Sequence, residues 1–299
     1  MTPTSNPSAS IHQRILNKAA AEQRPFNELL QYYAIERFLF RLGQSPYKKQ
    51  FILKGALVFL AWQVPLTRPT RDIDFLGFTE NSIDNLVRII RQVCSLSLES
   101  DGIVFVPDSV KGEMIKENAD YHGIRIEFLG FLGKAKVNMR LDVGFADVVT
   151  PAARELELPT IFDTSSKPCI WAYPPETVVA EKFQAMVALG MVNSRMKDFY
   201  DLWYLTDSLE FDLGTLQEAV MNTFRERKTS LPKEAPDALR SGFAALKQTQ
   251  WVGFLKKNRI TGAPTDFILV IERLKKFFDP IIQSDGPRLV GWYPNVGWR

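Results

Sequence analysis

Histidine and cysteine are scarce in this sequence, which has two of each among its 299 residues. Cys94 and Cys169 cannot supply a disulfide framework or a cysteine-rich zinc site, so we expect a reducing, cytoplasmic setting. His12 lies near the N-terminus and His122 lies beside a glycine. Chemistry that needs a histidine base or several imidazole ligands is therefore not expected, and any metal site would be built from carboxylates.

Long apolar runs and a strong charge of one sign are also missing. No stretch reaches the length of a membrane span, and residues 1–10 form a Pro/Ser/Thr tract that we expect to be disordered. The formal net charge of +3 permits a nucleotide or RNA partner without arguing for one. With 45% hydrophobic and 24% charged residues, the composition is typical of a globular protein with a sizeable core.

The spacing of apolar residues predicts an α+β protein whose C-terminal half is helical. Residues 11–43 have a helical pattern, strands and helices alternate between about 50 and 175, and helices follow from residue 176. We predict a disordered tail, an α/β domain with N-terminal helices, a helical domain and an irregular tail, over residues 1–10, 11–175, 176–283 and 284–299. The helices of the C-terminal half are predicted over residues 176–190, 195–208, 214–226, 235–247 and 265–278.

The segment Arg71 to Gly77 carries the most informative pattern. Asp72 and Asp74 alternate with apolar residues, so in a strand both carboxylates share one face. Two carboxylates side by side repel each other unless a cation lies between them, and hard oxygen ligands suit Mg²⁺. The alternative is a charged pair on a solvated strand edge. The neighbouring arginines and the Lys-Gly turn upstream favour a metal site for nucleotide chemistry.

Two further segments could complete such a site. Residues 136–143 alternate between apolar and polar, which places Asp142 on the polar face of a half-buried strand, where a third carboxylate would be needed. An exposed aspartate at a strand end is the alternative. Upstream, a buried helix is predicted over residues 54–62, and Gly55 and Ala56 near its start would let backbone N–H groups approach a phosphate closely.

The helical half contains a lysine and two aspartates of interest. Lys182 lies among apolar residues of its helix, although its stem could snorkel to solvent. Asp198 and Asp201 lie three residues apart on the next helix and share a face. Their alternative role is to complement the dipole of that helix, since both follow a plausible N-cap at Asn193-Ser194.

In their order and spacing, these motifs resemble the AbiEii/AbiGii family of nucleotidyltransferase toxins, which includes the MenT toxins. The resemblance covers roughly residues 25–280, and its motifs are Lys54-Gly55-Ala56, Arg68 to Asp74, Leu141 to Gly144, Ala180-Glu181-Lys182 and Ser194 to Leu202. It departs at Ala56, because many members carry serine or glycine there, so no hydroxyl can contact a phosphate at this position.

The resemblance implies a nucleotidyltransferase-like mixed sheet with flanking helices, and transfer of a nucleoside monophosphate from an NTP to an acceptor hydroxyl. It implies that Asp72, Asp74 and Asp142 bind Mg²⁺, with a role as base as the alternative for Asp142. Lys182 would reach the phosphates, and Asp198 would align either Lys182 or the nucleotide. The residues that the resemblance assigns to nucleotide binding are Lys54, Gly55, Ala56, Arg68, Arg71, Lys182 and Asp201.

The acceptor implied by the resemblance is tRNA at its 3′ end, in a toxin–antitoxin or phage-defence system with a separately encoded antitoxin. No membrane partner is expected. One alternative is a non-catalytic nucleotide- or RNA-binding interaction protein on the same scaffold. Another is a nucleotidyltransferase that modifies a small molecule such as an antibiotic. A positive surface leading to the aspartates would favour tRNA, whereas a narrow acidic pocket would favour a cationic drug.

Overall fold

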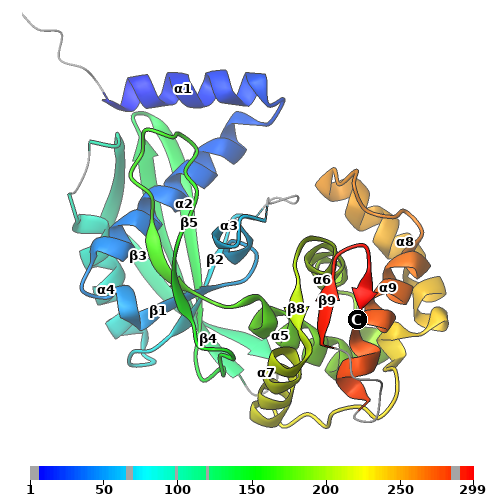
Figure 1. Cartoon of the computed structure of the whole chain (residues 1–299). Coiled ribbons are helices and arrows are strands. Elements are labelled where there is room, and N and C mark those ends of the chain that lie inside the picture. The colour runs from blue at the N-terminus through cyan, green and yellow to red at the C-terminus, as the bar shows by residue number, and fades with distance from the viewer. Residues whose placement is uncertain (1–6, 65–69, 98–99, 119–120, 284–289) are drawn as a thin grey trace, which may run out of the picture. The chain divides into compact units, whose positions relative to one another are not determined.

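The computed structural model describes residues 7–64, 70–97, 100–118, 121–283 and 290–299. The chain forms two compact units, and its ribbon is shown in Figure 1. The first unit comprises Met1–Ala146 and Arg154–Ala172, and the second comprises Asp147–Ala153 and Tyr173–Arg299. The segment Asp147–Ala153, which the sequence places in the α/β domain, thus groups with the helical unit.

The first unit is built on a seven-stranded mixed sheet with the strand order β3-β4-β5-β2-β1-β7-β6. Strand β2 runs parallel to β5 and β1 runs parallel to β7, while the other neighbours are antiparallel. The strands are β1 Phe51–Lys54, β2 Ile73–Gly77, β3 Ile103–Asn118, β4 Tyr121–Leu132, β5 Ala135–Gly144, β6 Arg154–Glu157 and β7 Cys169–Ala172. This mixed sheet with flanking helices confirms the predicted fold class.

One face of this sheet is apolar and is covered by helices. The helices of the first unit are α1 Pro7–Ala21, α2 Phe26–Gln44, α3 Val58–Ala61 and α4 Ile83–Ser95, with a short 3₁₀ turn over Lys48–Gln50. Phe38 of α2 packs against Phe128 of β4 with 5.1 Å between ring centroids, and Figure 1 shows α2 and α4 against the sheet. Since residues alternate along β4, its polar side chains lie on the opposite face, which is left for chemistry.

Two predictions about the first unit need correction. Residues 7–10, predicted within a disordered tail, belong to α1, and residues 1–6 lie outside the described part of the chain. The helix predicted over residues 54–62 is reduced to α3, because β1 continues to Lys54. Gly55 then has a φ of 70°, a left-handed conformation that breaks the strand and delays the helix.

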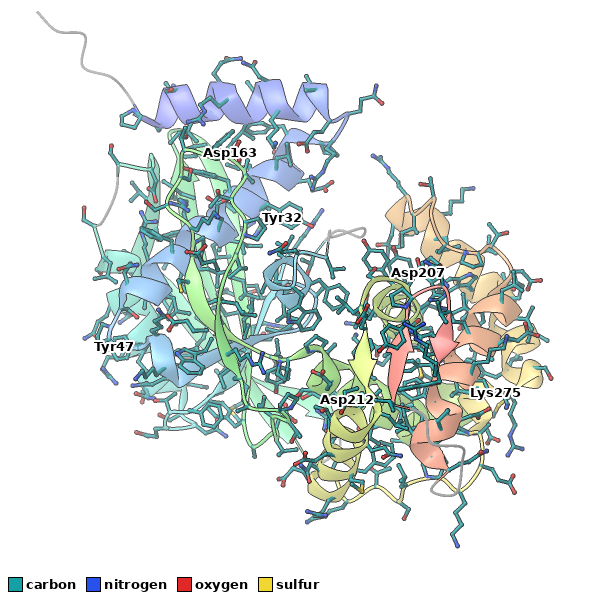
Figure 2. All side chains as sticks on the ribbon, viewed as in Figure 1. Tyr32, Tyr47, Asp163, Asp207, Asp212 and Lys275 are labelled. Atoms are coloured by element: carbon teal, nitrogen blue, oxygen red, sulfur yellow. The ribbon has the colours of Figure 1, made fainter. Side chains whose placement is uncertain are left out.

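The second unit is mainly helical. Its helices are α5 Pro175–Leu189, α6 Met196–Ser208, α7 Leu213–Glu226, α8 Ser241–Asn258 and α9 Phe267–Ile282, with 3₁₀ turns over Gly190–Val192 and Asp237–Leu239. Asp212, labelled in Figure 2, caps α7 by accepting a hydrogen bond of 2.8 Å from the Thr215 backbone N–H. The helix predicted over residues 235–247 begins later, as α8, and continues to Asn258.

The tail predicted to be irregular is folded where it is described, namely over residues 290–299. Strands β9 (Gly291–Tyr293) and β10 (Gly297–Trp298) form a small antiparallel sheet with β8 (Phe211–Asp212). The Trp292 indole donates a hydrogen bond of 2.8 Å to the Thr206 carbonyl, and the Trp298 indole donates one of 2.9 Å to the Phe277 carbonyl. These aromatic contacts fold the tail onto α9, although the tail sequence has no periodic pattern that would predict them.

Within the described residues, no helix combines the length and the apolar character that crossing a membrane requires.

Candidate active site

A row of charged side chains crosses the polar face of the first unit's sheet. Asp74 on β2 is the register partner of both Lys54 on β1 and Asp142 on β5. Asp142 is in turn the partner of Arg125 on β4. Register partners point to the same face, and neighbouring strands lie about 4.8 Å apart. Lys54, Asp74, Asp142 and Arg125, called the charged row below, therefore occupy consecutive positions, with the two aspartates in the centre.

A second row of charged residues lies beside the charged row. Arg140 is 3.7 Å from Asp72 and 3.0 Å from Glu127, which is in turn 3.3 Å from Lys111. Here positive and negative side chains alternate. In the charged row, by contrast, Asp74 and Asp142 place two like charges side by side, an arrangement that favours a bound cation.

The turn Lys54-Gly55-Ala56 lies directly against Asp74. A Cβ atom on Gly55 would come within 2.0 Å of the Asp74 Oδ2 atom, and Gly55 has a φ of 70°. Both the backbone conformation and the close approach therefore require glycine. Lys54 and Ala56 on either side are buried. The turn assigned to phosphate binding by the sequence is thus next to one of the predicted metal ligands.

Both oxygens of Asp142 are bound by one arginine. Arg125 Nε donates to Asp142 Oδ1 at 2.8 Å, and an Arg125 terminal nitrogen donates to Oδ2 at 2.7 Å. This hydrogen-bonded pair raises the pKa of Arg125 further above its usual range. Sequence reasoning missed Arg125. The signal available was its alternation with Ile124 and Ile126, which marks the polar face of its strand.

The predicted cluster of three carboxylates is not formed by these side-chain positions. Among the described residues, no group of three His, Cys, Asp or Glu side chains is arranged to hold a metal ion. Asp72 precedes β2 and lies beside Arg140, and Asp142 is held by Arg125. What fits a divalent cation is the like-charged pair Asp74 and Asp142 on one sheet face, whose carboxylate oxygens are suitable hard ligands.

A polar cavity of about 720 Å³ borders Asp72 in the first unit. Four cationic side chains line it, and they are called the basic groove below: Arg71, Lys111, Lys136 and Arg140. The carboxylates of Asp72 and Glu127 also line it, so cations outnumber anions by four to two. Arg71 is therefore near the predicted site, whereas Arg68 lies outside the described residues.

The predicted lysine and aspartates of the second unit meet in a buried cluster. Lys182 Nζ lies 2.7 Å from Asp198 Oδ1 and 2.8 Å from Asp201 Oδ2. The lysine side chain is 14% exposed, and those of the two aspartates are 2% and 1% exposed. Arg195 Nε contacts the other oxygen of Asp198 at 2.7 Å. Lys182 thus ends on two carboxylates instead of snorkelling to solvent, and the cluster of two cations and two anions is balanced.

The proximity of Lys182 to Asp198 agrees with the sequence prediction, whereas Asp201 as a second partner of Lys182 was not foreseen. The roles assigned to these residues stay predictions. The expected approach of Lys182, in the second unit, to the aspartates of the first unit also stays a prediction.

A further buried network in the second unit was missed by sequence reasoning. Arg227, which directly follows α7, lies 2.9 Å from Asp147 and 3.3 Å from Glu181, and the Tyr173 hydroxyl donates to Glu181 at 3.2 Å. Burial, then the charge of Glu181, raises the pKa of Tyr173 well above its usual value. The Thr177 hydroxyl also donates to the Thr150 carbonyl at 2.8 Å. These contacts fasten the segment Asp147–Ala153 to the helical unit.

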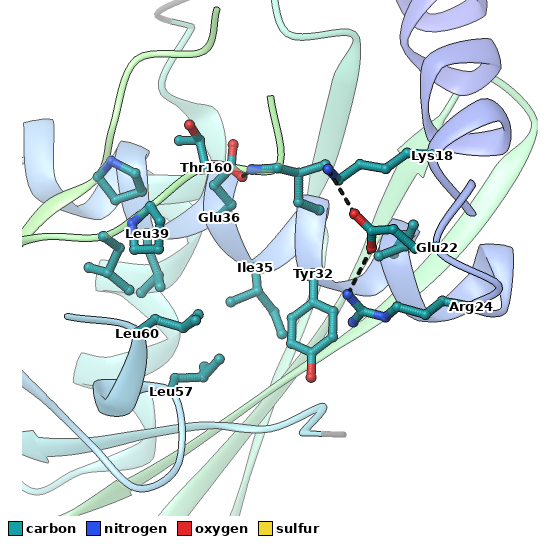
Figure 3. A pocket seen from close by; sticks show the side chains of 15 residues that line it. Lys18, Glu22, Arg24, Tyr32, Ile35, Glu36, Leu39, Leu57, Leu60 and Thr160 are labelled. Carbon is teal, nitrogen blue, oxygen red and sulfur yellow. Dashed lines mark hydrogen bonds and ion pairs between the residues drawn. The ribbon is translucent and has the colours of Figure 1, made fainter. Parts of the chain in front are cut away.

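A second cavity in the first unit, of about 290 Å³, is separate from the charged row. It lies between α2, α3 and the segment around Thr160, and Figure 3 shows Ile35, Leu57 and Leu60 among its lining. None of the predicted site residues in the described part of the chain lines it. Glu36 lies at its edge, and burial raises the pKa of this carboxyl group to about 7, with Arg37 opposing the shift.

The sheet of the first unit thus presents two paired aspartates beside a glycine turn. Comparison with known proteins identifies the family to which this chain belongs. Residues 37–277 match the family model described as nucleotidyl transferase AbiEii toxin, type IV toxin–antitoxin system. The chain therefore belongs to the AbiEii family and is a nucleotidyltransferase of the toxin type.

Two solved structures from Helicobacter pylori are similar to this chain. One, described as a candidate nucleotidyltransferase, is 13% identical to this chain and has a TM-score of 0.46. The match covers 83% of this chain and 95% of the chain in that structure. The other, JHP933, is 14% identical to this chain and has a TM-score of 0.43. The match covers 80% of this chain and 88% of the chain in that structure. No curated protein matches this chain.

Proposed function

We propose that this nucleotidyltransferase transfers a nucleoside monophosphate from an NTP to a hydroxyl at the 3′ end of tRNA, and that it depends on Mg²⁺. The observation that carries the proposal is the pairing of Asp74 with Asp142 beside the turn at Gly55. Such a reaction needs positioning of the phosphates and neutralisation of their charge more than covalent participation of the protein.

The proposed metal ligands are Asp74 and Asp142, with Asp72 beside them. Bound Mg²⁺ would neutralise charge on the triphosphate and on the departing pyrophosphate. The backbone at Gly55 and Ala56 would bind the phosphates, because the turn lies against Asp74 and a glycine allows close approach. Lys54, next to Asp74 in the charged row, and Arg71, which lines the basic groove, would add positive charge.

Lys182 is proposed to bind the phosphates of the NTP, held in place by Asp198 and Asp201. A buried ammonium group between two carboxylates has a fixed position, which suits the binding of a phosphate better than a mobile surface lysine does. Desolvation of the lysine is offset by these partners. Asp201 would thus contribute to the nucleotide site through Lys182.

The basic groove supports a nucleic acid as acceptor. Four cations line one cavity next to Asp72, and side chains of this kind bind the phosphates of a nucleic-acid backbone. A nucleotidyltransferase that modifies a cationic drug would instead need an excess of carboxylates around the site. The groove therefore favours RNA over a small-molecule acceptor. In a type IV system the chain would also have a separately encoded antitoxin as partner.

A transfer assay tests the proposal directly. Purified protein would be incubated with each labelled NTP in turn, Mg²⁺ and total tRNA. The expected result is label on tRNA from at least one NTP, abolished by chelation of the metal and in Asp74→Asn. Asp108→Asn, an exposed aspartate of the same sheet, serves as the matched control and should behave as the wild type. Equal labelling by Asp74→Asn, or label on no RNA, would refute the proposal.

Two substitutions in the basic groove separate RNA binding from nucleotide chemistry. Lys111→Gln together with Lys136→Gln removes two exposed cations that lie along the groove. Binding of tRNA should weaken, and its dependence on salt should decrease by a slope of up to about one for each phosphate that is no longer bound. Binding of the NTP should persist. If tRNA binding were unchanged, the acceptor would have to bind elsewhere.

A further inference from the structure

Within the charged row, Arg125 is the residue that has no role in the proposed function. It reaches from β4 to Asp142 with two parallel hydrogen bonds of 2.8 and 2.7 Å, one to each carboxylate oxygen. The side chain of Arg125 is 28% exposed and that of Asp142 is 14% exposed. This bidentate pairing, called the fork below, fixes both the position and the rotation of the carboxylate. A single point charge would not do so.

The order of the strands determines which side of the Asp142 carboxylate remains accessible to a cation. Strand β5, which carries Asp142, lies between β4 and β2. Arg125 therefore approaches Asp142 from one side, and Asp74 lies on the other. An ionised carboxylate has about four lone-pair sites on its two oxygens, and the fork occupies one on each oxygen. The remaining lone pairs can ligate a cation shared with Asp74.

Two effects of Arg125 on metal affinity oppose each other. Its positive charge repels a cation and would weaken metal binding. Its hydrogen bonds orient a metal ligand, and partners of this type commonly contribute about 10- to 100-fold in metal affinity. Because the guanidinium is partly exposed, solvent screens its charge, whereas the fork geometry is local and is not screened. The orienting effect is therefore the larger one.

We propose that Arg125 is a positioning residue of the metal site, which holds the Asp142 carboxylate in the orientation that ligates the cation together with Asp74. The inference rests on the proposed function, since it assumes a divalent metal at this pair. It assigns to Arg125 a structural task in metal binding and no contact with the reacting atoms.

Direct titration with Mn²⁺ tests this role without relying on turnover. Free Mn²⁺ would be counted by electron paramagnetic resonance in the presence of full-length wild type, Arg125→Gln, Arg125→Lys and Lys111→Gln. Lys111→Gln is the matched control, because it removes one cation from the same sheet face, where Lys111 forms an ion pair with Glu127. Circular dichroism and a melting curve would establish that each variant is folded.

The positioning role predicts a different result for each variant. Arg125→Gln should bind Mn²⁺ about 10- to 100-fold more weakly than the wild type. Arg125→Lys, which keeps the charge and loses the fork, should recover only part of that affinity. Lys111→Gln should bind Mn²⁺ as tightly as the wild type or slightly more tightly. Equal or tighter binding by Arg125→Gln would show that charge dominates, and full recovery in Arg125→Lys would show that the fork is not needed. Either result overturns the inference.

A measurement of stability separates failure of this inference from failure of the proposed function. If the wild type bound no Mn²⁺, the proposed metal site would fall and the inference with it. The pairing itself is tested by comparing the melting temperatures of Arg125→Gln, Asp142→Asn and the double variant. If the two residues act as a unit, the double variant should melt well above the temperature expected from adding the two single effects. Simple additivity would refute the pairing.

Discussion

The two units of this protein handle charge in opposite ways. On the sheet of the first unit, Asp74 and Asp142 place like charges next to each other on a partly open face, flanked by Lys54 and Arg125. In the second unit, Lys182 ends between two aspartates that are almost fully buried.

The difference shows which cluster favours a bound cation and which one already contains the cations that its carboxylates need. A pair of adjacent carboxylates on an open face gains stability when a cation binds. In a buried cluster whose carboxylates already have cationic partners, a metal ion is not needed, and removal of one partner is strongly destabilising. We therefore expect substitutions in the first cluster to affect chemistry, and substitutions in the second to affect stability as well.

The largest expected effect comes from Asp74→Asn. Removing this carboxylate should reduce nucleotide transfer by at least about 10²- to 10³-fold, because the charge that holds the metal is halved. The free energy of unfolding should stay the same or rise, since the substitution relieves repulsion with Asp142. Transfer rates and urea unfolding curves check both parts. A variant that retains transfer, or that unfolds much more easily, would contradict the description of the pair as a cation site.

Lys182→Ala should affect stability and chemistry together. It leaves Asp198 and Asp201 buried without their shared cation, which costs about 3–5 kcal/mol of the free energy of unfolding. NTP affinity and turnover should also fall together, because Lys182 is proposed to bind the phosphates. The control is Lys197→Ala, which removes an exposed lysine from the following helix, α6. If NTP binding and turnover were unaffected in a folded variant, the second unit would lose its proposed part in the chemistry.

Gly55→Ala tests whether the turn and Asp74 are in contact. A residue with a side chain at a φ of 70° costs about 1–2 kcal/mol, and the added Cβ would meet the Asp74 carboxylate. We expect lower stability and a loss of transfer, since Asp74 must move. Gly253→Ala on α8, where an added Cβ meets nothing, should instead be neutral or stabilising by up to about 1 kcal/mol. Chemical denaturation of both variants compares them.

The expected effect with the least influence on nucleotide transfer is a pH dependence at Glu36, a buried carboxylate of the first unit. Its pKa is raised from 4.5 to about 7, mainly by burial. The folded state therefore holds the proton more tightly than the unfolded state. Its contribution to stability is complete below pH 4.5 and is lost as the pH rises through about 7.

Between about pH 5 and 7 the free energy of unfolding should fall by up to about 1.4 kcal/mol per pH unit on account of Glu36. Glu36→Gln should flatten this dependence, because glutamine stays neutral, while the exposed Glu157→Gln should leave it unchanged. Urea midpoints measured across this range check the prediction. An unchanged slope in Glu36→Gln would mean that another group titrates there.

Local patterns were sufficient to predict much of the first cluster. Alternation along residues 136–143 placed Asp142 on the polar face of β5, and the glycine in Lys54-Gly55-Ala56 marked a turn that approaches another group closely. These features depend on neighbours in the chain, because side chains alternate along a strand and only glycine tolerates such a backbone conformation. The helical periodicity of about 3.6 residues likewise placed α5, α6 and α9 near their observed bounds.

Other features depended on contacts between distant segments, and no local pattern contained them. Arg125 as the partner of Asp142 follows from the register of β4 on β5, and Asp201 as the second partner of Lys182 follows from the packing of α6 beside α5. The tail around Trp292 and Trp298 was predicted to be irregular because its strands are very short and one of them pairs with Phe211–Asp212, far earlier in the chain.

The amino-acid sequence alone sets the local features of this nucleotidyltransferase: which carboxylates share a strand face, where glycine is required, and which helix faces are apolar. Which of these residues meet depends on the tertiary structure. Strand order and register brought Asp74 beside Asp142 and set Arg125 on the far side, and helix packing enclosed Lys182 between two aspartates. The physical reason is that side-chain direction is set by the local backbone, whereas pairing is set by burial summed over the whole core.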